Sequence, residues 1–187
     1  MLSLKAYVPF LLVILVFIQC TKPKIHYLRP IISVTPESRE LFGCRINGKP
    51  FSPMAVDSSS MGRCVYYQVY KGEAGYRFEI TGNRYESGCR FLSLSIVLDS
   101  VQVRRGQAYE LGSPGAKKNY AKYFIVSDCS QGSEEIYTSD ELPGMLIITK
   151  FDENKKIVHG TFDFKMKDAN GNLFRISDGI FDRHFAN

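Results

Sequence analysis

The sequence predicts an all-β protein: a single antiparallel β-sandwich or β-barrel, a meander of about nine or ten strands, with a lipocalin-like barrel as one form of it. Several runs alternate apolar and polar residues with a period of two, which is typical of strands with one buried face. Turn signals rich in Gly, Pro, Asn and Asp separate these runs, and no amphipathic helical pattern is found. With 187 residues, 44% hydrophobic and 23% charged, the chain is long enough for one folded domain with attachments, and wholesale disorder is excluded.

Residues 1–19 are predicted to be a lipoprotein signal peptide. Lys5 gives a basic start, and the apolar run Ala6–Ile18 is shorter than the roughly 20 residues of a spanning helix. The run ends in Phe17-Ile18-Gln19-Cys20, which resembles a bacterial lipobox, so we expect the Cys20 thiol to be diacylated. The alternatives are an uncleaved membrane anchor and an ordinary signal peptide cut elsewhere, with Cys20 incidental.

Residues 20–40 are predicted to be a lipid-anchored flexible tether, and residues 41–187 the β-rich domain. Three prolines interrupt any helix in the tether, namely Pro23, Pro30 and Pro36. The chain is therefore expected in the cell envelope, held to the membrane through the lipid. Because Thr21 gives no retention signal of the Asp type, we expect the outer membrane, with the domain facing the periplasm.

The strands of the domain are predicted from the alternation of its apolar residues. Clear examples are Tyr76, Phe78 and Ile80; Leu92, Leu94, Ile96 and Leu98; and Phe162, Phe164 and Met166. The run Met145–Thr149 is apolar on both faces, as in a central strand. Turn signals include Gly82-Asn83, Ser113-Pro114-Gly115, Pro143-Gly144, Asn170-Gly171 and Asp178-Gly179.

The C-terminal part is predicted to form consecutive antiparallel strands over residues 157–185. Asn170-Gly171 should set their register as a tight hairpin, because both residues tolerate positive φ. The side chains expected to point inward are Phe162, Phe164, Phe174, Ile176, Phe181 and Phe185.

The chain has five cysteines, and if Cys20 carries lipid an even set of four remains. These disulfide candidates are Cys44, Cys64, Cys89 and Cys129. Export permits disulfides, so we expect at least one, with Cys64–Cys89 as the first choice among the connectivities that stay open. Free buried thiols are the alternative. A zinc site is not expected, because no two of these cysteines have the close spacing of zinc ligands.

The charge and the polar residues argue against several classes of function. The net charge is +5, part of the basic excess lies in the tether, and the domain is nearly neutral, so nucleic-acid binding is not expected. His159 and His184 could meet if their strands pair, but no nucleophile elbow accompanies them. The acidic run at residues 152–154 is followed by lysines, as in a solvated hairpin tip. We predict no catalytic residue, no metal site and no cofactor.

Tyrosines crowd residues 64–85, and two of them are candidates for a contact surface. In Val65-Tyr66-Tyr67-Gln68-Val69-Tyr70, Tyr67 shares a face with the valines, whereas Tyr66 and Tyr70 share the other face with Gln68. Exposed rings of this kind stack on sugars or anchor partner proteins, and packing against neighbouring strands is the alternative role for these two. The sequence therefore predicts a non-enzymatic binding domain for an unknown protein or glycan partner. The alternatives are a lipocalin-like carrier of a small apolar ligand and a hydrolase of envelope glycans.

Two stretches resemble a family of uncharacterised lipoproteins common in Bacteroidota, with a domain of unknown function. One is residues 42–51, with Asn47-Gly48 between aromatics. The other runs from residues 144–152 through residues 157–164, with Gly160-Thr161-Phe162-Asp163-Phe164, to residues 176–182, with Asp178-Gly179-Ile180-Phe181-Asp182. The resemblance implies a lipobox followed by one β-rich domain in the envelope. It implies no catalytic residues.

Overall fold

The computed structural model describes residues 41–53, 65–72, 75–86, 90–115, 118–127 and 132–184, with the backbone alone for residues 65–72, 75, 183 and 184. These residues form eleven strands in two sheets, and no helix is found among them. All strand pairs are antiparallel. The predicted all-β class is confirmed.

Sheet A has six strands in the order β2-β1-β11-β10-β9-β6. Their bounds are β1 (Leu41–Ile46), β2 (Lys49–Phe51), β6 (Ala108–Leu111), β9 (Gly144–Asp152), β10 (Ile157–Lys167) and β11 (Leu173–His184). Sheet B has five strands in the order β3-β4-β5-β7-β8. Their bounds are β3 (Val65–Gly72), β4 (Gly75–Tyr85), β5 (Phe91–Asp99), β7 (Tyr120–Val126) and β8 (Ser133–Tyr137).

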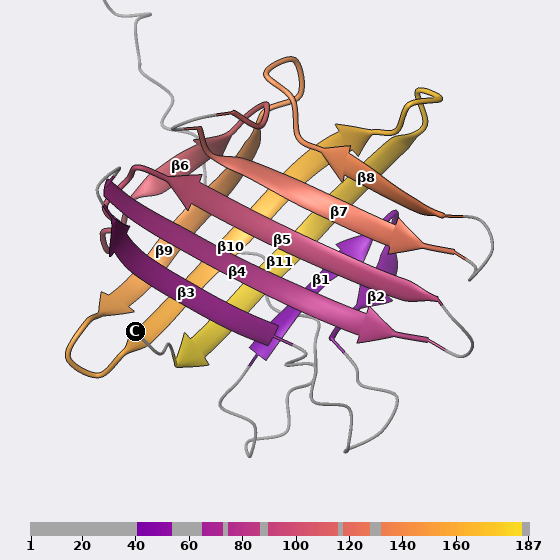
Figure 1. Ribbon diagram of the computed structural model, residues 1–187. Helices are drawn as coiled ribbons and strands as arrows, with labels where there is room; N and C mark the ends of the chain where they lie inside the picture. Colours follow the sequence, from indigo (N-terminus) through magenta and orange to yellow (C-terminus); the bar gives the residue numbers. More distant parts are fainter. Residues whose placement is uncertain are drawn as a thin grey trace, which may run out of the picture.

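The two sheets form a sandwich and do not close into a barrel. The strands of sheet B cross in front of those of sheet A in Figure 1. Only parts of the chain are simple meanders, namely β3–β5 and β9–β11, because β6 leaves sheet B and pairs with β9. The first strand, β1, pairs with the last, β11.

One hydrophobic cluster fills the space between the sheets. Its largest fully buried members are Phe78, Phe164, Phe181, Ile80, Leu94, Ile96, Leu98, Leu111, Ile136, Leu146, Ile148 and Met166. The inward prediction is confirmed for Phe162, Phe164, Ile176 and Phe181, which are buried, and Phe174 packs partly buried against the cluster. Phe185 lies outside the described residues.

The hairpin between β10 and β11 differs from the tight turn that Asn170-Gly171 predicted. Residues 168–172 form a longer loop between the paired Lys167 and Leu173, and of the two predicted turn residues only Gly171 has a positive φ, 83°. The carboxylate of Asp168 closes the loop, because its Oδ1 accepts hydrogen bonds from the amides of Asn170 (3.0 Å) and Asn172 (2.7 Å). The two-residue hairpin is found instead at Asn47-Gly48, where both residues have positive φ.

Two predicted turns lie inside strands. Gly82-Asn83 belongs to β4, and Asp178-Gly179 lies within β11. In β11, Ser177 and Asp178 stand between the pairs Phe164–Ile176 and Phe162–Gly179, and Asp178 has a φ of 54°. This extra residue is a β-bulge, and it lets Ile176 and Phe181 both face the core although they differ in parity.

The family-like motifs of β10 and β11 pack against each other reciprocally. In the register of the two strands Gly160 stands opposite Phe181, and Phe162 stands opposite Gly179. A Cβ atom added at Gly160 would overlap the Phe181 ring, and one added at Gly179 would overlap the Phe162 ring. Each glycine therefore makes room for the phenylalanine of the other strand. Phe42 of β1, which pairs with Phe181, places its ring 5.5 Å from that of Phe162.

Two strands depart from their predicted burial. Met145–Thr149 was expected to be buried on both faces, but β9 alternates and Met145 is 40% exposed. The strand buried on both faces is β5, which the sequence pattern indicated to be polar on one side. Its outward residues Ser93, Ser95 and Val97 are 9%, 4% and 2% exposed.

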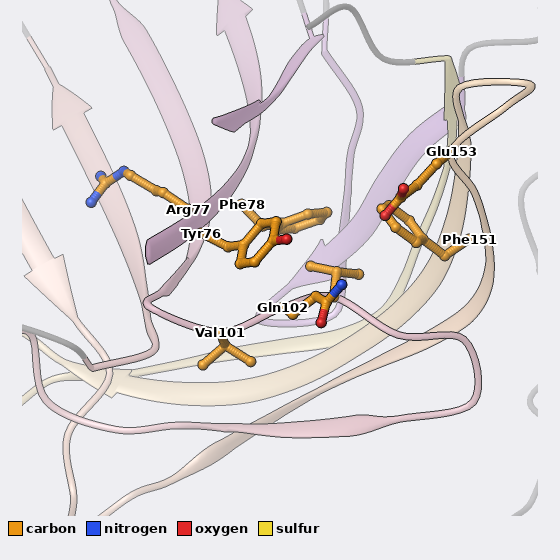
Figure 2. Close-up of a pocket in the computed structure, with 8 residues that line it drawn as sticks. Tyr76, Arg77, Phe78, Val101, Gln102, Phe151 and Glu153 are labelled. Carbon is orange, nitrogen blue, oxygen red and sulfur yellow. The ribbon is translucent and has the colours of Figure 1, made fainter. Parts of the chain in front are cut away.

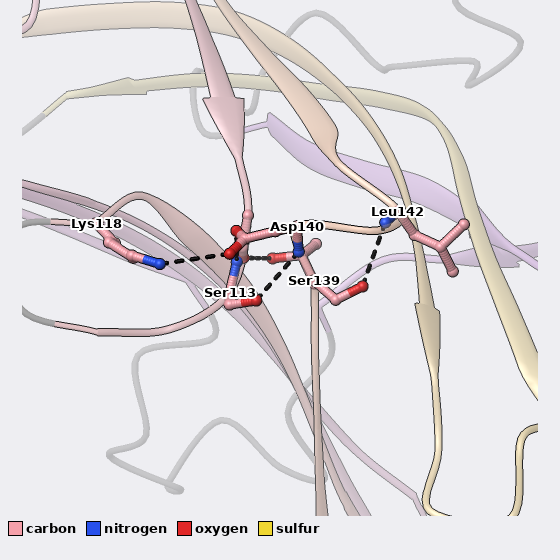
Figure 3. Close-up of polar contacts among 7 residues, drawn as sticks. Ser113, Lys118, Ser139, Asp140 and Leu142 are labelled. Atoms are coloured by element: carbon pink, nitrogen blue, oxygen red, sulfur yellow. Dashed lines mark hydrogen bonds and ion pairs between the residues drawn. The ribbon is translucent and has the colours of Figure 1, made fainter.

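At one polar corner, hydrogen bonds connect the two segments that pass from one sheet to the other, β6–β7 and β8–β9 (Figure 3). The segment after β6 meets the segment after β8, where the Asp140 Oδ1 accepts a hydrogen bond from the Ser113 amide (2.8 Å) and the Ser113 Oγ accepts one from the Asp140 amide (3.1 Å). The buried Thr138 hydroxyl donates to the Gly112 carbonyl (2.7 Å) and accepts from the Ala121 amide (2.9 Å). These bonds join the connection between β6 and β7 to the connection between β8 and β9, so we assign the corner a structural role.

Candidate functional site

The outer face of sheet B carries aromatic rings where a two-layer sandwich normally meets water with polar residues. Alternate residues of β4, β5, β7 and β8 point away from the core, because their neighbours Ile80, Ile96, Tyr123 and Ile136 are part of it. We call this surface the aromatic face; its rings are Tyr85, Phe91, Tyr120, Phe124 and Tyr137. All five side chains are partly exposed. The face is turned toward the viewer in Figure 1.

The rings form two groups on this face. Tyr85, Phe91 and Phe124 lie at one end. The ring centroids of Tyr85 and Phe91 are 4.7 Å apart, and those of Phe91 and Phe124 are 5.9 Å apart. Tyr120 and Tyr137 form the second group, with centroids 6.0 Å apart. Tyr120 and Phe124 are both on β7, four residues apart, which corresponds to about 13 Å along an extended strand.

Small polar side chains lie between the two groups. Thr81 of β4 and Ser95 of β5 share a hydrogen bond of 2.8 Å between their hydroxyl oxygens, and both are nearly fully buried. They stand opposite each other in the register, next to Lys122 of β7. These residues point outward yet have little exposure. The aromatic face thus has buried hydroxyl groups between its two groups of rings.

Hydrogen bonds hold the Tyr137 end of the face in place. The Tyr137 hydroxyl donates to Glu135 Oε2 (2.6 Å), and Lys122 Nζ donates to Glu135 Oε1 (3.0 Å). The bond to Glu135 raises the pKa of Tyr137 to about 12, and the bonds from Tyr137 and Lys122 lower the pKa of Glu135. At neutral pH the phenol is therefore protonated and the carboxylate charged, which keeps both bonds intact.

Arg77 extends this network to β4. Its Nη2 lies 3.2 Å from Oε2 of Glu79, which is two residues further along β4 and also points outward. Burial lowers the pKa of Arg77, but its hydrogen bonds to Tyr120 and Glu79 outweigh burial and raise it. The ring of Tyr120 is thus tethered by its hydroxyl to a charged group. Rings fixed in this way offer rigid, amphipathic contact area.

The predicted contact residues Tyr66 and Tyr70 belong to β3, the strand beside β4. The register pairs Tyr66 with Thr81 and Tyr70 with Arg77, and both of these partners point to the outer face of sheet B. The side chains of Tyr66 and Tyr70 lie outside the described part of the chain. The five rings of the aromatic face were missed, except that Tyr85 belonged to the tyrosine-rich segment.

A pocket opens where the two sheets part at one corner (Figure 2). It is lined by Tyr76, Arg77, Phe78, Val101, Gln102, Val103, Phe151 and Glu153. The space inside it is about 20 Å³, which is about the room that one water molecule needs. A carrier of an apolar ligand would need several hundred Å³, so this pocket gives that alternative no support.

The predicted polar candidates are placed as follows. Nε2 of His159 lies 2.8 Å from Oδ1 of Asp182, its partner in the register, whereas His184 stands opposite Ile157. The Asp152 Oδ1 accepts a hydrogen bond from the Lys155 amide (2.9 Å), as expected of a hairpin tip. Among the described residues, no group of three or more His, Cys, Asp or Glu side chains is placed to hold a metal ion. No described helix is long and apolar enough to cross a membrane.

Cys44 is the one disulfide candidate within the described residues. Its thiol is free and 1% exposed, and burial together with the nearby Asp178 raises its pKa to about 12. Cys20, Cys64, Cys89 and Cys129 lie outside the described residues. The strands that are next to Cys64, Cys89 and Cys129 in the sequence have their nearer ends at the same end of sheet B. There, one cross-strand row is formed by Tyr85, Phe91, Val126 and Ser133, and β3 begins opposite Gly82.

We expect Cys44 to resist alkylation in the folded protein and to react on unfolding. With a pKa of about 12, only about one thiol in ten thousand is a thiolate at pH 8. In the unreduced but denatured protein, iodoacetamide should modify Cys44 and one of Cys64, Cys89 and Cys129, because the other two are expected to be joined. Peptide mapping checks both steps. Modification of Cys44 in the folded protein, or of all four cysteines after unfolding, would contradict the expectation.

A comparison with known families gives a match. The family model described as Domain of unknown function (DUF6252) matches residues 66–183, from β3 into β11. The matched segment contains the aromatic face and both reciprocal glycine–phenylalanine motifs of β10 and β11. No match was found among curated proteins or among solved structures.

Proposed function

The chain belongs to the family described as Domain of unknown function (DUF6252), whose description gives no activity, and we propose a function from the structure instead. The protein is a membrane-tethered, non-enzymatic binding domain, and its binding surface is the aromatic face. The observation that carries the proposal is that partly exposed rings stand on the same outer face as the buried outward residues of β5. An outer sheet face that only meets water has no need of such rings, whereas rings at a surface are typical of recognition sites.

The hydrogen bonds of the face favour binding over catalysis. The phenol of Tyr137 and the ammonium of Lys122 are both engaged by Glu135, and Arg77 is engaged by Glu79 and Tyr120. These groups hold one another in position, so they preorganise the rings for a partner. Less side-chain freedom is then lost when the partner binds.

We propose that the tether and lipid bring this face to the cell envelope. The support is the sequence: the lipobox-like Phe17-Ile18-Gln19-Cys20 and the proline-containing residues 20–40, as in the Bacteroidota lipoproteins that the chain resembles. The outer membrane, with the domain in the periplasm, is the location we propose.

The binding surface is tested by cross-linking in living cells. A photoreactive phenylalanine analogue placed at Phe124 or at Tyr120 should give discrete adducts with a partner, because both side chains belong to the aromatic face. The same analogue at Met145 or Leu173, which are exposed on sheet A, is the matched control and should give none. Adducts from the control positions alone, or from all four alike, would refute the proposal.

The anchor is tested by acyl labelling. An azido-fatty acid should label the wild-type protein, and Cys20→Ala should abolish labelling and leave an unprocessed precursor, since the thiol is the site of lipid attachment. Cys44→Ala is the control and should label like the wild type, because its thiol is buried in the core. Equal labelling of Cys20→Ala and wild type would show that Cys20 is not the anchor.

A further inference from the structure

We infer that the ligand of the aromatic face is a neutral glycan, bound along β7 across both groups of rings. The inference rests on the proposed function and names the chemistry of the partner. It follows from three properties of the face: which polar groups lie between its rings, how its cations are paired, and what kind of apolar surface it offers.

The part of the face between the two groups of rings is polar. Lys122 stands between Tyr120 and Phe124 on β7, and the hydroxyls of Ser93, Ser95 and Thr81 lie across β5 and β4 from it. The centre of a protein–protein interface is instead its more apolar part. A sugar chain fits the order seen here, because its ring faces are apolar and its edges carry hydroxyls along the whole length.

Both cations among the described residues of the face are paired with carboxylates of the face. Lys122 pairs with Glu135 at 3.0 Å, Arg77 pairs with Glu79 at 3.2 Å, and Asp99 stands opposite Arg77 in the register. An anionic ligand would compete with Glu135 and Glu79 for these cations and would have to break the pairs. A hydroxyl group can instead accept from Lys122 while donating to Glu135, so the paired charges suit a neutral ligand with many hydroxyls.

The apolar surface of the face is aromatic, with neighbouring rings tilted by 48° to 63° to one another. The large hydrophobic side chains that stand out as exposed in the described chain, Met145 and Leu173, lie on sheet A. Ring faces carry the negative side of the aromatic quadrupole, and the C–H groups on one face of a sugar ring point their positive ends at it. The two groups of rings, about 13 Å apart along β7, give an extended chain a stacking platform at each end.

The test is affinity electrophoresis and calorimetry of the purified protein with soluble neutral polysaccharides (glucans, mannans and galactans), and with a uronic-acid polymer as the charged counterpart. The wild type should bind one or more neutral polymers, and Tyr120→Ala and Phe124→Ala should each weaken binding about tenfold or more. Met145→Ala is the control and should bind like the wild type. Because alanine variants can lose stability, Tyr120→Leu and Phe124→Leu are measured beside them: they keep apolar volume but lose the flat ring, and they should bind as weakly.

The outcomes separate this inference from the proposed function. Binding only to the uronic-acid polymer, or neutral binding that the ring variants leave unchanged, overturns the glycan inference. If no polysaccharide binds while Phe124 and Tyr120 still cross-link to an envelope protein, the face is a binding surface for protein and the glycan inference is wrong. If neither binding nor cross-linking occurs, both proposals fall.

Discussion

Replacement of Phe164 by alanine should cost about 3–5 kcal/mol of folding free energy, the usual range for emptying a buried aromatic site. Phe164 is 1% exposed, and its ring lies 5.8 Å from that of Phe162 at an interplanar angle of 25°. The side chain is seated on Gly144, where an added Cβ would overlap it. Against a total stability of roughly 5–15 kcal/mol, such a loss brings a single domain close to unfolding.

Denaturant unfolding of Phe164→Ala beside Lys165→Ala checks this value. Lys165 is the next residue on β10 and is exposed on the outer face of sheet A, so its loss should change stability by about 0.5 kcal/mol or less. The two substituted residues are neighbours in the sequence but lie on opposite faces of β10. Similar midpoints for both would mean that the inward and outward sides of β10 have been confused.

The substitution Gly179→Ala should be almost as damaging although it adds only a methyl group. The new Cβ would meet both the ring of Phe162 and its carbonyl oxygen, the latter at 2.5 Å, so a turn of the ring cannot relieve the overlap. We expect a loss of about 3 kcal/mol, at the upper end of the range for overpacked cores. The same variant should leave the far-ultraviolet spectrum of the folded state unchanged while lowering the melting temperature.

Gly115→Ala is the matched control for this prediction. Gly115 also lacks a positive φ, but the nearest neighbour of an added Cβ is the flexible side chain of Lys118, at 3.3 Å. That side chain can move away, so the expected loss is close to zero. A loss equal to that of Gly179→Ala would show that the reciprocal packing of β10 and β11 contributes nothing particular.

The sequence was informative where alternation alone decides the structure. Phe162, Phe164 and Phe181 could be predicted to be buried because a period of two leaves few choices for a strand with one apolar side. The bulge at Asp178 was missed, although a signal was present: Ile176 and Phe181 cannot share a face of a regular strand, since they differ in parity. A single extra residue of positive φ reconciles them.

Pairing between distant strands could not be predicted from the same pattern. The strand β6 has only four residues, and nothing in Ala108–Leu111 says that it pairs with β9 in the other sheet. The aromatic face was missed for the same reason. Its rings come from four strands between Tyr85 and Tyr137, and a search for tyrosines close in sequence finds only the cluster at residues 64–85. Register brings them together, and register depends on contacts that sequence neighbours do not reveal.

The family-like motifs have a structural explanation that the sequence did not offer. Gly160-Thr161-Phe162 and Gly179-Ile180-Phe181 run antiparallel, so that each glycine faces the phenylalanine of the other. Asn47 turns the chain between β1 and β2, and its side-chain Oδ1 accepts a hydrogen bond from the Arg175 amide (2.8 Å). These residues hold sheet A together, on the side of the molecule away from the aromatic face.

The pairing of β1 with β11 has a consequence for the order in which the protein folds. Asn47 and Arg175 are 128 residues apart in the chain, yet they are hydrogen-bonded neighbours. One edge of β1 can pair early with β2, but its other edge stays unpaired until the last part of the chain has been made, and closing such long loops is slow. If the chain crosses a membrane as it leaves the cell's interior, its domain cannot complete sheet A before the final strand arrives. Sheet A would then remain incomplete, and this part of the chain unfolded enough for transport, until transport is nearly over.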